Sequence, residues 1–196
     1  MADRHDVDDR LAFAIADAVG GRTPDGMVRH SDGTGAKHID LVRYNNVPFR
    51  GGVTFGTLGL STFSIGGQTA DTGPDLRVEL VGATYARFRT YDNVLATCAF
   101  SVMDGAPVMP GQIYEGAVEP YFPGFELKHV LFTEPYLWDD AFTLVELGDT
   151  TVVWLQPVPI TQRELDFAVA VGTDALIERF EEERIDAADM DRESVI

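Results

Sequence analysis

The sequence has little cysteine and no long apolar run. A single cysteine among 196 residues, Cys98, excludes an intramolecular disulfide framework. No apolar run approaches the ~20 residues that a helix needs to cross a bilayer. The N-terminus lacks the basic flank and apolar core of a secretory signal. These absences predict no membrane association and favour a cytoplasmic protein.

Positive charge is also scarce. The chain has 15 lysines and arginines against 32 acidic residues, a net charge of −17, and its lysines are Lys37 and Lys128. Proteins that bind the phosphate backbone need a Lys/Arg footprint, so no direct nucleic-acid binding is expected. Three explanations of the acidic surface stay open: ordinary solubility, a salt-rich cytoplasm, or a basic protein partner such as a nuclease or nucleic-acid-binding toxin.

Apolar residues are plentiful enough for one core. They make up 45% of the chain, and its length is typical of one domain. The strand-like segments lie mostly in the middle, with helices at both ends and one inserted. This order predicts an α+β fold, a single domain with a largely antiparallel or mixed β-sheet and flanking helices. We expect helices at 6–19, 91–103, 161–172 and onward to 183, and strands at 37–44, 53–65 (two short ones), 76–80, 113–121, 128–133, 142–147 and 151–156. Loops are expected at 22–36 and 66–74.

The last third of the chain carries the clearest local signals. Gly148-Asp149 separates two β-rich runs and predicts a two-residue hairpin turn. Pro157 and Pro159 are expected to stop the second strand, because proline cannot donate to a ladder. Thr161 and Glu164 have the spacing of a helix capping box, and Thr173 is expected to cap a further helix.

One strand in the middle predicts its own orientation. Leu76, Val78 and Leu80 alternate with Arg77 and Glu79. Strict alternation is typical of a strand with one buried face. We therefore expect the three apolar side chains in the core and the two charged ones facing away from it.

Catalytic motifs are weak. Asp71-Thr-Gly73 matches the short aspartic-protease signature, but a polar stretch precedes it and a plain turn explains it as well. His38 and Asp40 share one face of a strand, which suits either a metal or a structural hydrogen bond. Cys98 lies on an apolar helical stripe and is expected to be a buried thiol. No cofactor, metal or catalytic residue is predicted, and a hydrolase using Asp71 is kept as an alternative.

Two acidic and aromatic segments are candidates for partner binding. Aromatic residues in a connecting segment can anchor an interface, although they can equally fill the core. Acidic residues at a helix end are commonly just solvated, although they can also form a patch for a basic partner. The candidates are Tyr136, Trp138, Asp139, Asp140, Glu181, Glu182 and Glu183.

Several short segments, taken in order, resemble a known family. They are Gly59-Leu-Ser61, Arg77-Val-Glu-Leu-Val-Gly82, Val152-Val-Trp-Leu-Gln-Pro-Val-Pro-Ile160, Arg163-Glu-Leu165, Gly172-Thr-Asp-Ala-Leu-Ile-Glu-Arg-Phe180 and Asp191-Arg-Glu-Ser-Val195. Together they resemble the suppressor of fused domain in its bacterial form, over residues 37–196. Residues 1–36, a helix and a loop, are assigned to the same domain. No counterpart of the second domain of the animal protein is seen.

The resemblance implies a non-enzymatic α+β binding domain. Animal members sequester a transcription factor, and bacterial members are interpreted as immunity proteins that neutralise a toxin. It therefore implies a protein partner, such as a basic toxin, and the alternative is a regulatory binding protein without a toxin partner. It supplies no catalytic residues, and neither the contact face nor the oligomeric state follows from it.

Overall fold

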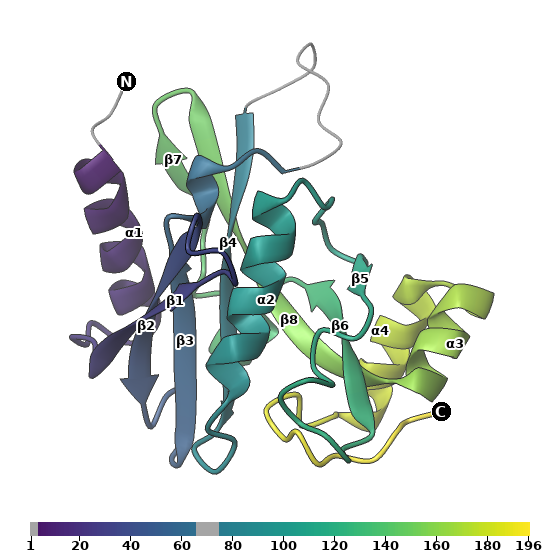
Figure 1. Cartoon of the computed structure of the whole chain (residues 1–196). Coiled ribbons are helices and arrows are strands. Elements are labelled where there is room, and N and C mark those ends of the chain that lie inside the picture. The colour runs from purple at the N-terminus through teal and green to yellow at the C-terminus, as the bar shows by residue number, and fades with distance from the viewer. Residues whose placement is uncertain (1–3, 66–74) are drawn as a thin grey trace.

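The computed structural model describes residues 4–65 and 75–196 (Figure 1). Its helices are α1 (Arg4–Ala18), α2 (Tyr91–Met103), α3 (Gln162–Val171) and α4 (Thr173–Glu183), with short 3₁₀ helices η1 (Leu60–Thr62) and η2 (Tyr136–Trp138). Its strands are β1 (Gly26–Ser31), β2 (His38–Asn45), β3 (Gly52–Leu58), β4 (Asp75–Tyr85), β5 (Ile113–Tyr114), β6 (Leu127–Thr133), β7 (Val145–Leu147) and β8 (Thr150–Thr161).

The strands form one mixed sheet in the order β1-β2-β3-β4-β8-β6-β5, and β7 forms a hairpin with the start of β8. β1 to β4 are antiparallel neighbours, β4 and β8 are parallel, and β8, β6 and β5 are antiparallel again. The long strand β8 therefore lies between segments that come much earlier in the chain. This is the predicted α+β single domain with a mixed sheet and flanking helices.

Helices cover both faces of the sheet (Figure 1). α2 packs on one face, where Val94 and Leu95 belong to the same buried cluster as Leu41 and Leu80. α1 packs on the opposite face through Leu11 and Ile15. The pair α3–α4 covers the end of the sheet formed by β6 and β8, in a cluster that includes Leu176 and Phe180. No helix in the described ranges is long and apolar enough to cross a membrane.

Most predicted helices and the hairpin are confirmed. The hairpin turn lies at Gly148, whose φ is +69°, and Asp149. In the capping box the Thr161 hydroxyl accepts a hydrogen bond from the Glu164 N–H at 3.2 Å, and the Thr161 N–H donates to Glu164 Oε2 at 2.8 Å. Thr173, in contrast, is the first residue of α4 and caps nothing, because Gly172 holds the N-cap position without a side-chain bond.

The expected loop at 22–36 contains the edge strand β1. Its residues are mostly exposed, so no buried face marks it in the sequence. Pairing with β2 holds it instead. Arg29 lies directly opposite Asp40 and forms a two-pronged ion pair with it, at 2.7 and 2.6 Å.

The two prolines do not stop the second strand of the hairpin. β8 continues through Pro157 and Pro159 to Thr161. The last β8 residue paired with β4 is Leu155, so among the described residues no strand pairs with the prolines on that side. Their carbonyls point there, accepting hydrogen bonds from the Tyr91 hydroxyl at 3.0 Å and Arg192 Nη2 at 2.9 Å. The N–H and C=O of a strand residue share one side, so the missing N–H groups remove no ladder bond.

Glu79 faces the interior, which corrects the expected orientation of this strand. Val78 and Leu80 are buried as predicted and Leu76 only partly, but Glu79 is fully buried as well. The segment from Gly59 to Ser61 closes over its carboxylate. Alternation places a residue on a face of the sheet, and it does not show whether another segment covers that face.

Two other predicted strands differ in extent. The run 53–65 forms one strand, β3, followed by η1 instead of a second strand. Only Ile113 and Tyr114 of the predicted strand 113–121 pair with β6, because the chain then turns at Gly116, whose φ is +71°.

Candidate functional site

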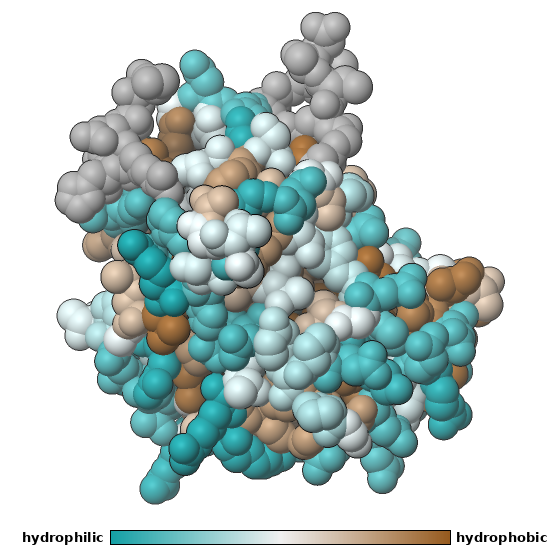
Figure 2. All heavy atoms as spheres, in the orientation of Figure 1, coloured by the Kyte–Doolittle hydropathy of each residue, from teal (hydrophilic) through white to brown (hydrophobic). Residues whose placement is uncertain are grey.

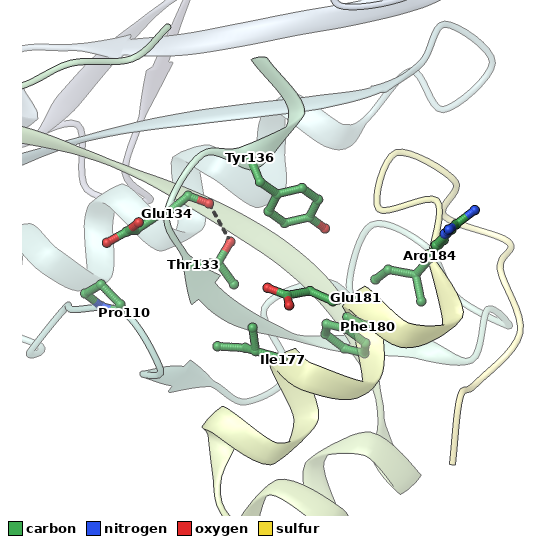
Figure 3. A pocket seen from close by; sticks show the side chains of 9 residues that line it. Pro110, Thr133, Glu134, Tyr136, Ile177, Phe180, Glu181 and Arg184 are labelled. Carbon is green, nitrogen blue, oxygen red and sulfur yellow. Dashed lines mark hydrogen bonds between the residues drawn. The ribbon is translucent and has the colours of Figure 1, made fainter. Parts of the chain in front are cut away.

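A cavity of about 470 Å³ opens between η2 and α4 (Figure 3). Its apolar lining comes from Pro110, Tyr136, Ile177, Phe180 and Ile185. The polar groups around it belong to Thr133, Glu134, Glu181 and Arg184. A mostly apolar hollow of this size with a few charged groups is typical of a binding site.

A second hollow of similar volume adjoins the first. The two share Pro110, Glu134 and Tyr136. The second one extends past Asp140 and Leu144 towards β8. We call the two together the Tyr136 groove. Tyr136 lies at their junction with 45% of its surface exposed, and Leu144 is also largely exposed.

Aromatic packing holds the segment that carries Tyr136 in place. The Phe142 ring lies between those of Trp138 and Trp154, with centroids 5.2 and 5.3 Å away. The Trp138 indole N–H donates to Thr54 Oγ1 at 3.3 Å, and the Trp154 indole N–H donates to the Thr143 carbonyl at 3.1 Å. This rigid base fixes the position of the Tyr136 ring at the groove.

Acidic groups surround the groove and lack cations. The Glu181 carboxylate points into the first cavity beneath the Tyr136 ring, whereas that of Glu134 points to the side of Pro110 (Figure 3). Within the described part of the chain, no cation lies within ion-pair distance of either carboxylate. The Arg184 guanidinium points away from the cavity (Figure 3). Although part of Tyr136 is exposed, desolvation by the surrounding protein raises its pKa to about 12, so its hydroxyl is neutral.

The structure brings three of the seven predicted partner-binding residues together. Tyr136 and Glu181 line the first cavity, and Tyr136 and Asp140 line the second. Asp139 is exposed beside Asp140 in a turn where both have positive φ, 48° and 60°. Aspartate tolerates this conformation better than most residues.

The other candidates lie outside the groove. Trp138 is only 6% exposed and belongs to the core against α1, which is the core-filling alternative left open by the sequence. Glu182 and Glu183 are exposed on α4, and Glu182 pairs with Arg179 at 3.1 Å. A partner-binding role for any of these residues stays a prediction.

Sequence reasoning does not identify Glu134 as a groove residue, and it does not show that Ile177 and Tyr136 line the same cavity. Glu134 is a single acidic residue between a strand and Pro135, and no pattern marks it. Ile177 and Phe180 are recognisable only as an apolar helical stripe. Their contribution to a cavity depends on how α4 packs beside η2, which is a tertiary feature.

The weak catalytic motifs gain no support. Asp71 lies outside the described residues. Asp40 is engaged by Arg29, as described above, and no metal-binding cluster is present in the described residues. Cys98 is fully buried, as predicted, and burial raises the pKa of its thiol to about 12, so it is a poor nucleophile.

Comparison with solved structures shows the same fold. A suppressor of fused homologue from Neisseria gonorrhoeae superposes with a TM-score of 0.71 at 16% identity, over 98% of both chains. A Sufu–Fu complex gives 0.67 at 12% identity, over 96% of this chain and 92% of the other. Drosophila Suppressor of Fused gives 0.65 at 13% identity and is covered over only 50% of its length.

Sequence comparison is more specific. The immunity protein YqcF of Bacillus subtilis strain 168 is 33% identical over 187 residues, which are 95% of each chain. The sequence profile of the family described as suppressor of fused protein (SUFU) matches residues 35–193. This match covers most of the chain and confirms the resemblance carried by its short motifs. The chain therefore belongs to the suppressor of fused protein family.

Proposed function

We propose that this chain is an immunity-type protein, which neutralises a toxin by binding it directly and catalyses no reaction. The observation that carries the proposal is the 33% identity with an immunity protein over 95% of both chains. Family membership supports a protein-binding role, because a solved relative is a complex of Sufu with Fu. The scarcity of cysteine supports a cytoplasmic location.

The Tyr136 groove is the contact surface in this proposal. Exposed apolar residues that gather at a hollow mark interaction sites, and Tyr136 and Leu144 do so here. Hydrophilic residues cover most of the face viewed in Figure 2, with an apolar patch in the region of α3 and α4. Val169 and Val171 of α3 are exposed but line neither of the two hollows.

The net charge of −17 suits a basic toxin. Opposite charges accelerate association at low salt, and screening removes that effect. We expect the association rate with the toxin to fall at least about tenfold between about 15 mM and about 500 mM NaCl. An association rate that does not change with salt, measured by stopped flow, would contradict electrostatic steering.

Co-expression with a candidate toxin tests the function. The chain is first purified at low salt, its partner is identified by mass spectrometry, and any toxin gene beside its own is cloned as well. Restored growth together with a stoichiometric complex would support the proposal. A stable complex with a non-toxic protein would favour the regulatory alternative. If there is no growth rescue and no complex forms, both the immunity role and the regulatory alternative are refuted.

A further inference from the structure

We propose, resting on the proposed function, that the first cavity of the Tyr136 groove receives an arginine side chain of the basic partner. The cavity places an aromatic ring, an aliphatic wall and an unpaired carboxylate around one hollow. Each of these surfaces suits one part of an arginine side chain. The ring suits the planar guanidinium, the wall suits the three-carbon stem, and the carboxylate suits the positive charge.

The aliphatic part of arginine fits the wall formed by α4. Ile177 and Phe180 point from α4 into the cavity below Tyr136 (Figure 3). Arginine buries its methylene groups along apolar surface while its charge stays near polar groups. The Phe180 ring already has a guanidinium nearby, because Arg192 Cζ lies 5.1 Å from its centroid. A second guanidinium approaching from the cavity would use the same cation–π attraction at Tyr136.

The charge comes from Glu181. Its carboxylate points into the cavity, and no cation within the described residues pairs with it. A neutral apolar side chain in the cavity would bury this carboxylate without a partner, and an acidic one would repel it, so both are unfavourable. A guanidinium satisfies it with two parallel charge-assisted hydrogen bonds.

The charge complementarity between the groove and a basic partner extends beyond one arginine. Glu134 and Asp140 continue the negative potential from the first cavity into the second. A basic segment lying along the groove would therefore meet a carboxylate at each hollow. Tyr136 supplies the ring between them, as aromatic residues do at the centre of many interfaces.

A peptide titration of the full-length chain tests the inference. The probe is acetyl-Leu-Arg-Leu-amide, and its neutral counterpart carries citrulline instead of arginine. Amide shifts of the ¹⁵N-labelled protein are followed by NMR up to millimolar peptide. We expect saturable shifts at the amides of Thr133, Glu134 and Tyr136 and of residues 177–185, and about tenfold weaker binding of the citrulline peptide.

Two substitutions on the same helix make the test specific. Glu181→Gln should weaken binding of the arginine peptide about tenfold, because it removes the charge of the side chain but keeps its shape. Glu178→Gln, one turn earlier on α4 and outside the cavity, is the matched control and should change binding less than twofold. Equal binding of both peptides, no saturable shift in the cavity, or an unchanged affinity in Glu181→Gln would overturn the inference.

The outcome separates this inference from the proposed function. If the wild-type chain protects cells from the toxin but the peptide fails, the arginine site is wrong and the immunity role stands. If no toxin is neutralised, the immunity role fails whatever the peptide does.

Discussion

The buried carboxyl group of Glu79 gives the sharpest test of the structure. Its Oε1 accepts hydrogen bonds from the N–H groups of Gly59 at 3.1 Å and Ser61 at 2.9 Å, and its Oε2 accepts one from Thr57 Oγ1 at 2.5 Å. No cation contacts it in the described part of the chain. Desolvation outweighs these bonds and raises the pKa of Glu79 from 4.5 to about 7.

A raised pKa makes the folded protein lose stability as the pH rises. In the unfolded chain Glu79 releases its proton near pH 4.5, whereas the folded protein holds it until about pH 7. Between these values the folded state binds more protons, so its stability falls with increasing pH. The shift corresponds to about 3 kcal/mol of free energy of unfolding, present below pH 4.5 and lost as the pH passes through about 7.

Replacing Glu79 with glutamine removes this titration and keeps the shape. The glutamine oxygen can accept from Gly59 and Ser61, and its amide can donate to Thr57, whose hydroxyl then turns to the Leu80 carbonyl 3.4 Å away. We expect Glu79→Gln to gain about 3 kcal/mol relative to the wild type between about pH 4.5 and about pH 8.

Urea unfolding across this pH range measures the effect, because urea adds no charge. Subtracting the two curves cancels the titration of the many exposed acids. If the difference in free energy between wild type and Glu79→Gln stays constant within about 0.5 kcal/mol, the reasoning about this carboxyl is wrong.

Three further predictions follow from contacts in the core. In Gly82→Ala the added Cβ would lie 2.7 Å from the hydroxyl of Tyr91, a buried and hydrogen-bonded side chain, so we expect a loss of about 1–3 kcal/mol in urea unfolding. Arg192→Met leaves the fully buried Glu164 carboxylate without its cation, 2.7 Å away, and should cost about 3–5 kcal/mol by the same measurement. Cys98 should react with a thiol reagent only at the rate of protein opening, because it is buried and neutral.

Each of these has a matched comparison. Gly26→Ala meets no atom within 4 Å and should change stability by less than about 0.5 kcal/mol. Arg179→Met breaks an exposed pair with Glu182 and should cost less than about 1 kcal/mol. Urea-unfolded protein gives the full thiol rate for Cys98. A large loss in either control variant, or rapid labelling of Cys98 in the native protein, would contradict the assigned contacts.

Local chemistry made much of the fold predictable. The capping box at Thr161 and Glu164 and the hairpin at Gly148 depend on residues that are neighbours in sequence, so their pattern is visible without the structure. The helix from Tyr91 to Met103 was marked by its apolar stripe. Thr90 at its N-cap position makes no side-chain bond, although the helix begins where expected.

The remaining features depend on which segments meet. Pro157 and Pro159 fit inside β8 because the pairing of β8 with β4 ends at Leu155, and no residue of β8 predicts where that pairing ends. β1 forms because its residues, including Arg29, pair with β2. The Tyr136 groove likewise needs α4 beside η2. Sequence reasoning found Tyr136 and Glu181 as separate candidates, and only packing brings them to one cavity.

The position of β8 has a consequence for how the chain is made. β1 to β4 pair with sequence neighbours, so their meander can form while the rest is still being synthesised. The other edge of β4 has to wait for residues 150–155. An unpaired strand edge invites pairing with another chain. A nascent chain halted between α2 and β7 therefore exposes the unpaired edge of β4 to other chains. The ribosome-bound protein should depend on chaperones until β8 has been synthesised.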